Sequence, residues 1–140
     1  MLSLEPLLTA HLESLPGFKG VHGLPDLMGA ELASRPSPCL YVVFDGYRPL
    51  ESTGRGKASQ VETRWLVVLS VKHGGKVADG SPARSLAAPL VQSILGHLLG
   101  WQPAPGFTPL TLAAGPRPDF ATGLLLFPLA FTTTQVVKGN

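Results

Sequence analysis

The sequence predicts an α+β fold: a single domain, residues 1–140, with a central mixed or antiparallel β-sheet flanked by about three helices. Two stretches carry apolar residues at helical spacing, and several apolar runs are rich in β-branched and aromatic residues. Turns rich in glycine and proline separate these stretches, and no repeat or low-complexity linker divides the chain. A length of 140 residues suffices to bury a hydrophobic core without disulfides or metals.

Three helices are expected. The first runs from Ser3 to Leu15, because leucines recur there every three or four residues and Pro16 follows. A short second helix is expected from Pro25 to Ser34, since proline is favoured at the first helical position. The third lies within residues 81–99 and ends at a glycine; its internal Pro89 must sit in the first turn of a shorter helix or kink a longer one.

Strands are expected at residues 18–21, 39–44, 61–72, 110–113 and 122–137. The apolar centre of the 61–72 run indicates a strand that is covered on both faces. In the last strand Leu125, Phe127, Leu129 and Phe131 alternate and are expected to share a face, while Pro128 indicates an edge or a bulge.

Residues 45–60 contain Gly46, Pro49, Gly54 and Gly56 and few apolar residues, which predicts a long loop. Residues 51–58 differ from a phosphate-binding loop at its essential first and last positions, which are Glu51 and Ala58 here. Two interpretations remain for this segment: a mobile, mildly basic surface loop, or an arm that docks on a partner.

The charge content is low. Hydrophobic residues make up 44% of the chain and charged residues 14%, against roughly 25% charged in ordinary globular domains. Either apolar patches are exposed as interaction surfaces, or the 16 glycines and 14 prolines displace charged residues in loops. A net charge of +2 is too weak for a dedicated nucleic-acid binder.

No catalytic, metal or cofactor site emerges from the sequence. The single cysteine, Cys39, excludes an internal disulfide and is expected to be a small buried residue. The four histidines are scattered without metal-ligand spacing, and His97 is expected at the edge of the core. We therefore expect no enzyme, no metal and no cofactor.

The beginning of the chain lacks the basic region of a signal peptide, and its longest apolar run, near residues 124–131, is far shorter than the ~20 residues of a membrane span. The expectation is a soluble cytoplasmic protein. Trp101, just after the third helix, is expected to pack back onto that helix, with an exposed interface anchor as the alternative. Trp65 is expected in the core or at a subunit contact.

The whole-chain layout resembles the tail terminator proteins of long-tailed bacteriophages, Mu-like and lambda-like, most closely the Mu-like group found in prophages. The resemblance rests on the opening helix in residues 2–15, the strands 40–44 and 63–69 and the long segment between them. It rests most on the helix that ends in the sequence Leu-Leu-Gly-Trp-Gln-Pro, residues 98–103, followed by Pro109 and a terminal strand.

The resemblance implies a protein that forms a hexameric ring without any reaction or cofactor. Such a ring caps the completed tail tube, stops tube polymerisation and offers the surface to which the head joins. Implied partners are other copies of the chain, the tail tube protein and the head-completion protein, with DNA passing through the lumen. Another head–tail joining or tail-completion protein is the first alternative, and a small enzyme with a dispersed active site is the second.

Arg48, Arg55 and Lys57 are the predicted partner-binding residues, because they give the 45–60 segment a positive tip. This segment is expected to be poorly ordered or extended in isolation and to order on assembly. The tip could meet an acidic rim on the tube protein or face the DNA channel, and the sequence leaves both possibilities open.

Overall fold

The computed structural model describes residues 1–23, 35–72, 81–121 and 123–140. The described helices are α1 (Leu4–Glu13) and α3 (Ser81–Leu98). The described strands are β1 (Val21–His22), β2 (Cys39–Thr53), β3 (Ala58–Lys72), β4 (Thr111–Ala113), β5 (Asp119–Ala121) and β6 (Leu124–Lys138). Neither described helix has both the length and the apolar character that a membrane crossing requires.

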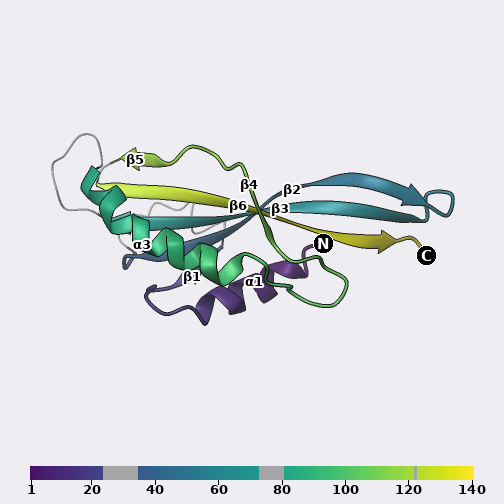
Figure 1. The fold of residues 1–140 in the computed structure, drawn as a ribbon, viewed down its shortest axis with the longest axis horizontal. Helices are drawn as coiled ribbons and strands as arrows, with labels where there is room; N and C mark the ends of the chain where they lie inside the picture. The colour runs from purple at the N-terminus through teal and green to yellow at the C-terminus, as the bar shows by residue number, and fades with distance from the viewer. Residues whose placement is uncertain (24–34, 73–80, 122) are drawn as a thin grey trace.

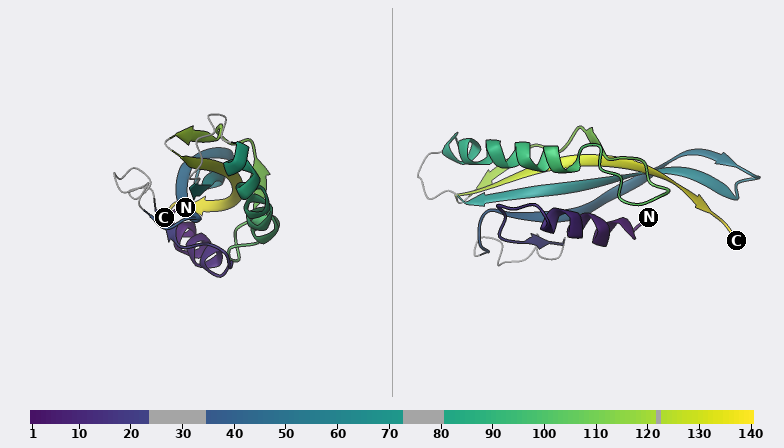
Figure 2. Two further views of the ribbon diagram at one scale, coloured as in Figure 1. Left: turned by 90° about the vertical axis from the view of Figure 1, so that its left-hand side faces the viewer. Right: turned by 60° about the horizontal axis from the view of Figure 1, so that its bottom comes forward.

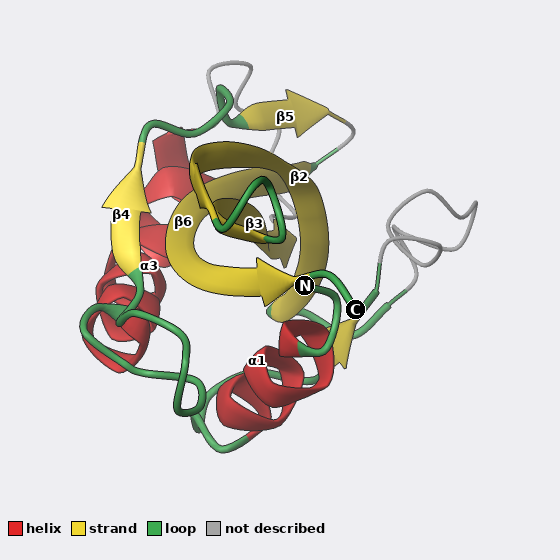
Figure 3. Ribbon diagram, turned by 90° about the vertical axis from the view of Figure 1, so that its right-hand side faces the viewer, coloured by secondary structure: helices red, strands yellow, loops and turns green. Residues whose placement is uncertain are grey.

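These strands form one mixed sheet of six strands in the order β1-β2-β3-β6-β4, and β5 also pairs with β6. β1 is parallel to β2, whereas β3 is antiparallel to both of its neighbours, β2 and β6. The long strands curl around one another, and both helices lie on the same side of the curled sheet (Figure 3). The predicted α+β class with a mixed sheet is confirmed.

The expectation of about three helices is not met in the described part of the chain, which contains α1 and α3. The predicted helix from Pro25 to Ser34 falls on residues 24–34, outside the described residues. Helix α1 begins and ends close to its predicted bounds, and the turn after it passes through Gly17, at φ +102°. Ser3 occupies the N-cap position, but its hydroxyl makes no capping hydrogen bond.

Helix α3 continues through Pro89, so the longer of the two predicted helices is correct. Pro89 is exposed, on the side of the helix away from the sheet. The helix is followed by Gly100 at φ +79°, a left-handed conformation that favours glycine and that the sequence indicated at this position. The segment after the helix returns to the helix end at Leu110. There the N–H of Leu110 donates to Trp101 O, and the carbonyl oxygen of Leu110 accepts from the N–H of Gly100.

The main core lies between the two helices and one face of the sheet (Figure 2). Helix α1 contributes Leu4, Leu8 and Leu12, the stripe that predicted this helix. β6 contributes Leu125, Leu129 and Phe131 with Phe127 packed beside them, which confirms that these alternating residues share a face. Trp65, on β3, is fully buried at the centre of this layer.

The opposite face of the sheet carries a second, smaller apolar cluster. It consists of Cys39, Tyr41, Val43 and Val68, with Leu66 and Leu126 packed against it. Cys39 is 2% exposed, as expected for a small buried residue. The two clusters explain why the apolar centre of β3 has buried side chains on both faces.

The prediction that residues 45–60 form a loop is wrong. β2 continues to Thr53, β3 begins at Ala58, and only residues 54–57 turn the chain between them. The glycines and the proline that indicated a loop have other roles: register shifts at residues 44–47 and 49–51 place Gly46 and Pro49 at irregularities of β2. Gly54 and Gly56 adopt positive φ in the turn.

Pro128 pairs with Val68 of β3 on one side, but neither β4 nor β5 reaches it on the other side. The prediction of an edge at Pro128 is therefore confirmed locally, in the gap between the two short strands.

Candidate functional site

The most distinctive feature of the molecule is an arm of three strands that projects beyond both helices (Figure 1). We define the arm as residues 45–53 of β2, 58–64 of β3 and 132–138 of β6, with the turn 54–57 as its tip. The continuous register of β6 along β3, from Leu124 to Lys138, fixes the third strand of the arm. A three-stranded antiparallel sheet is stable where a lone hairpin is marginal.

One face of the arm, on the helix side of the sheet, is buried near its base. Val61, Thr63 and Thr133 lie there with exposed fractions of 3% or less. The segment after α3 covers them, since Thr108 N–H donates to Thr134 O and the two hydroxyls of Thr108 and Thr133 lie 3.3 Å apart. The base of the arm is therefore fixed to the body of the protein.

Ion pairs hold the other face near the base. Arg64 Nε lies 2.7 Å from Asp45 Oδ2, and its Nη2 donates to Ala114 O at 2.6 Å. Arg48 Nη2 lies 3.3 Å from Glu62 Oε1 on the neighbouring strand. Because these pairs are exposed, each adds only about 0–1 kcal/mol to stability.

The structure separates the three predicted partner-binding residues. Arg55 and Lys57 lie together in the tip and are exposed, whereas Arg48 lies along β2 and is paired with Glu62. Lys138 joins the tip instead, because it pairs with Ala58 directly beside the turn and the next residue, Gly139, donates its N–H to Lys57 O. No local sequence pattern indicated Lys138, which lies 81 positions after Lys57.

The arm also exposes apolar side chains. Tyr47, Leu50 and Val136 are 60%, 40% and 55% exposed, respectively. Large exposed apolar residues close to a positive tip are typical of a protein-binding surface. The arrangement suits recognition of another macromolecule, and it contains no group of residues suited to bond chemistry.

A second feature is a stack of rings where α1 meets the end of α3. His11 lies between His97 and Trp101, with ring centroids 3.9 Å and 4.0 Å away. Each histidine Nε2 lies close to the backbone oxygen of the other, His11 to His97 O at 3.0 Å and His97 to His11 O at 2.7 Å. Trp101 packs against the core and is not an exposed anchor, but its ring stacks on His11 of α1, whereas the prediction placed it on the third helix. His97 lies at the edge of the core, as predicted.

Ser14 Oγ lies 3.2 Å from His97 Nε2, which raises the possibility of a serine nucleophile. The geometry argues against it. A carbonyl oxygen only accepts, so His97 Nε2 must carry a proton to bond His11 O and cannot take one from Ser14. Ser14 itself donates to His11 O at 2.6 Å. These contacts join two helices.

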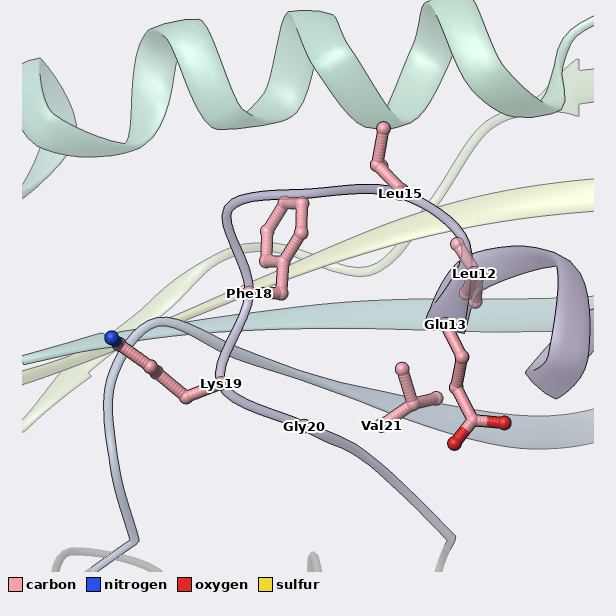
Figure 4. Close-up of a pocket in the computed structure, with 7 residues that line it drawn as sticks. All are labelled: Leu12, Glu13, Leu15, Phe18, Lys19, Gly20 and Val21. Atoms are coloured by element: carbon pink, nitrogen blue, oxygen red, sulfur yellow. The ribbon is translucent and has the colours of Figure 1, made fainter.

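The surface near α1 has a shallow depression of about 220 Å³ lined by Leu12, Glu13, Leu15, Phe18, Lys19, Gly20 and Val21. Its two charged side chains point to opposite sides, and Leu15 and Phe18 point toward α3 (Figure 4). Polar groups that converge on one point are expected in a ligand site, so this depression is a gap in packing.

The stack makes stability depend on pH. Burial lowers the pKa of His11, and the nearby charge of His97 lowers it further, while the hydrogen bond to His97 O opposes both. A depressed pKa means that the unfolded chain binds the proton more tightly, so stability falls as pH drops below the ordinary value of 6.5. We expect a lower melting temperature at pH 5.5 than at pH 7.5.

A His11→Gln variant should lose part of this pH dependence, because glutamine does not titrate. Thermal melting of both proteins at the two pH values tests this. An unchanged dependence in the variant would show that another group causes it.

Among the described residues, no group of three or more histidine, cysteine, aspartate or glutamate residues could hold a metal ion. The family model of the phage tail terminator protein matches residues 1–140, the whole chain. The chain belongs to the phage tail terminator family. No curated protein matches it.

As a member of the tail terminator family, the protein is a structural component of the phage tail and interacts with other tail or head proteins. A surface for protein contacts, rather than a reaction site, is what such a role requires. The arm exposes apolar residues and a basic tip.

Proposed function

We propose that the protein caps the completed tail tube as a hexameric ring, stops further tube polymerisation and provides the surface to which the head joins. The match of the family model to the whole chain carries this proposal. Residues 1–140 act as one domain that assembles in the host cytoplasm and then stays in the virion tail. The Mu-like prophage group is the proposed origin.

We further propose that the arm is the part that engages the tube. Its tip presents Arg55, Lys57 and Lys138 beyond the helices, where they can reach a neighbouring molecule before the body of the protein does. A positive tip favours an acidic rim on the tube protein, or the phosphates of DNA in the channel. The protein needs no cofactor and catalyses no reaction in this role.

Reversing the charge of the tip tests this proposal. We expect the double variant Arg55→Glu/Lys57→Glu to bind tube ends at least tenfold more weakly, since a close charge pair across an interface can contribute about 1.5 kcal/mol or more and about 1.4 kcal/mol corresponds to a tenfold change in affinity. Sedimentation of the protein with purified tubes measures the binding. The variant should keep its melting temperature, because both side chains are exposed.

The matched control is Lys19→Glu/Arg117→Glu, which changes the net charge equally at two exposed cations outside the arm. Equal loss of binding in both double variants would refute a role for the tip. Normal tube binding combined with defective DNA retention in virions would instead place the tip on the DNA channel.

A further inference from the structure

The arm has two free edges, one on each side. On the β2 side, β1 pairs with Leu40 and Tyr41 alone, so no described strand pairs with the outer edge of residues 45–53. On the β6 side, β4 ends opposite residues 130–132 and Thr108 bonds Thr134, so no described strand pairs beyond that point. Unpaired strand edges readily add a strand from another chain.

The two edges are complementary to each other. Leu50, on β2, and Val136, on β6, are exposed apolar residues. Glu51 and Lys138 carry opposite charges, and neither has an ion pair among the described residues. Glu51 and Val136 both align with Gln60 of β3, and Lys138 aligns with Ala58, two residues before Gln60. Aligned residues and alternate residues share a face of a sheet, so Glu51, Val136 and Lys138 lie on one face.

The irregularities of β2 limit where another strand can pair. Register shifts at residues 44–47 and 49–51, together with Pro49, interrupt the edge near the base. Such features protect an edge from uncontrolled pairing. A regular stretch remains at Glu51, Ser52 and Thr53, next to the tip, and only a short pairing is possible there.

We propose that the β6 edge of one copy, at Val136–Lys138, pairs with the β2 edge, at Glu51–Thr53, of a second copy of this chain. β2 and β6 both run antiparallel to β3 and thus run in the same direction. Copies arranged with their arms side by side therefore form a parallel, head-to-tail contact, and repeated contacts of this kind close into a ring.

This inference rests on the proposed ring and identifies the contact between its subunits. In this parallel register Val136 of one copy lies beside Glu51 of the next, and Lys138 lies beside Thr53. The long side chain of Lys138 can therefore reach the carboxylate of Glu51 from the neighbouring diagonal position on the same face. The short pairing makes each contact weak, so a ring closes only when every subunit is held in place. The tube end supplies that template.

Cross-linking of mixed single-cysteine variants tests the contact. One preparation carries Glu51→Cys and the other, tagged to change its mass, carries Lys138→Cys; the only native thiol, Cys39, is buried and inert. With both variants mixed on purified tube ends, a short bis-maleimide should join the two variants several-fold more often than it joins either variant to itself. A self-complementary contact would join like with like instead, and that result would overturn the proposal.

The control mixture pairs Lys138→Cys with Glu13→Cys, an exposed carboxylate on α1. Equal cross-linking in the control mixture would overturn the proposed contact. The wild-type protein is examined in parallel on tube ends by electron microscopy. Six-fold rings without the specific cross-link would refute this contact but keep the proposed function, whereas the cross-link without rings would refute the function but keep the contact.

Discussion

A protein with a shortened arm should fold normally and fail to complete tails. The change replaces residues 51–60 by Asn-Gly. Pro49 and Val61 keep their native pairing and are then joined by a three-residue loop, Leu50-Asn-Gly, that ends in glycine. The deleted residues 51–57 are exposed, and residues 58–60 are only partly buried. We expect a melting temperature within a few degrees of the wild type, but overlong or headless tails in electron micrographs of complemented lysates.

The control is a chain with Arg48→Gln, which removes a cation and its contact with Glu62 but keeps the arm at full length. It should complete tails at close to the normal level. Normal tail completion by the shortened protein would show that the docking surface lies elsewhere, with the sheet edge near residues 127–134 as the next candidate.

The arm also shows where the sequence misleads. Gly46, Pro49, Gly54 and Gly56 all disfavour strands, and local propensity therefore predicted a loop. The structure accommodates Gly46 and Pro49 at shifts of register and uses Gly54 and Gly56 for the turn. Pairing with β3 and, through it, with β6 decides the conformation, and such distant partners are invisible to local patterns.

Elements with a strong apolar period were predicted well. The leucine stripe of α1, the alternation of β6 and the glycine after α3 all depend on residues close in sequence, and each has its expected place. The basic tip was predicted in part: Arg55 and Lys57 are neighbours in the chain, while Lys138 reaches them only through the register of β6 on β3.

The ring stack could not have been predicted from spacing. His11 and His97 are 86 residues apart and meet only because α1 and α3 lie side by side on the sheet. Their contacts are mainly with each other's backbone, which no side-chain motif encodes. The position of His97 in the predicted helix was enough to place it at the edge of the core. Its contact with His11 could be known only from the three-dimensional structure.

The largest expected loss of stability is at Trp65. Its side chain is 0% exposed, packs edge-on against Phe44 with ring centroids 5.1 Å apart, and donates Nε1–H to Thr63 Oγ1 at 3.1 Å. Trp65→Ala would leave a cavity in the middle of the main core and remove the donor to Thr63. We expect a loss of about 3–5 kcal/mol in the free energy of unfolding, measured by denaturation with urea.

Trp65→Phe separates the two causes of this loss. Phenylalanine keeps most of the apolar volume but cannot donate to Thr63, so the expected loss is about 1–2 kcal/mol. Tyr47→Ala, at an exposed aromatic residue on the arm, should change stability by less than about 0.5 kcal/mol and serves as the control. Trp65 lies on β3 beneath the helices, while Tyr47 lies on the projecting part of β2. The comparison therefore separates the core that holds the fold from the arm, the proposed partner-binding surface. A Trp65→Ala protein as stable as the wild type would mean that the core collapses around the gap, and the assignment of Trp65 as the centre of the fold would be wrong.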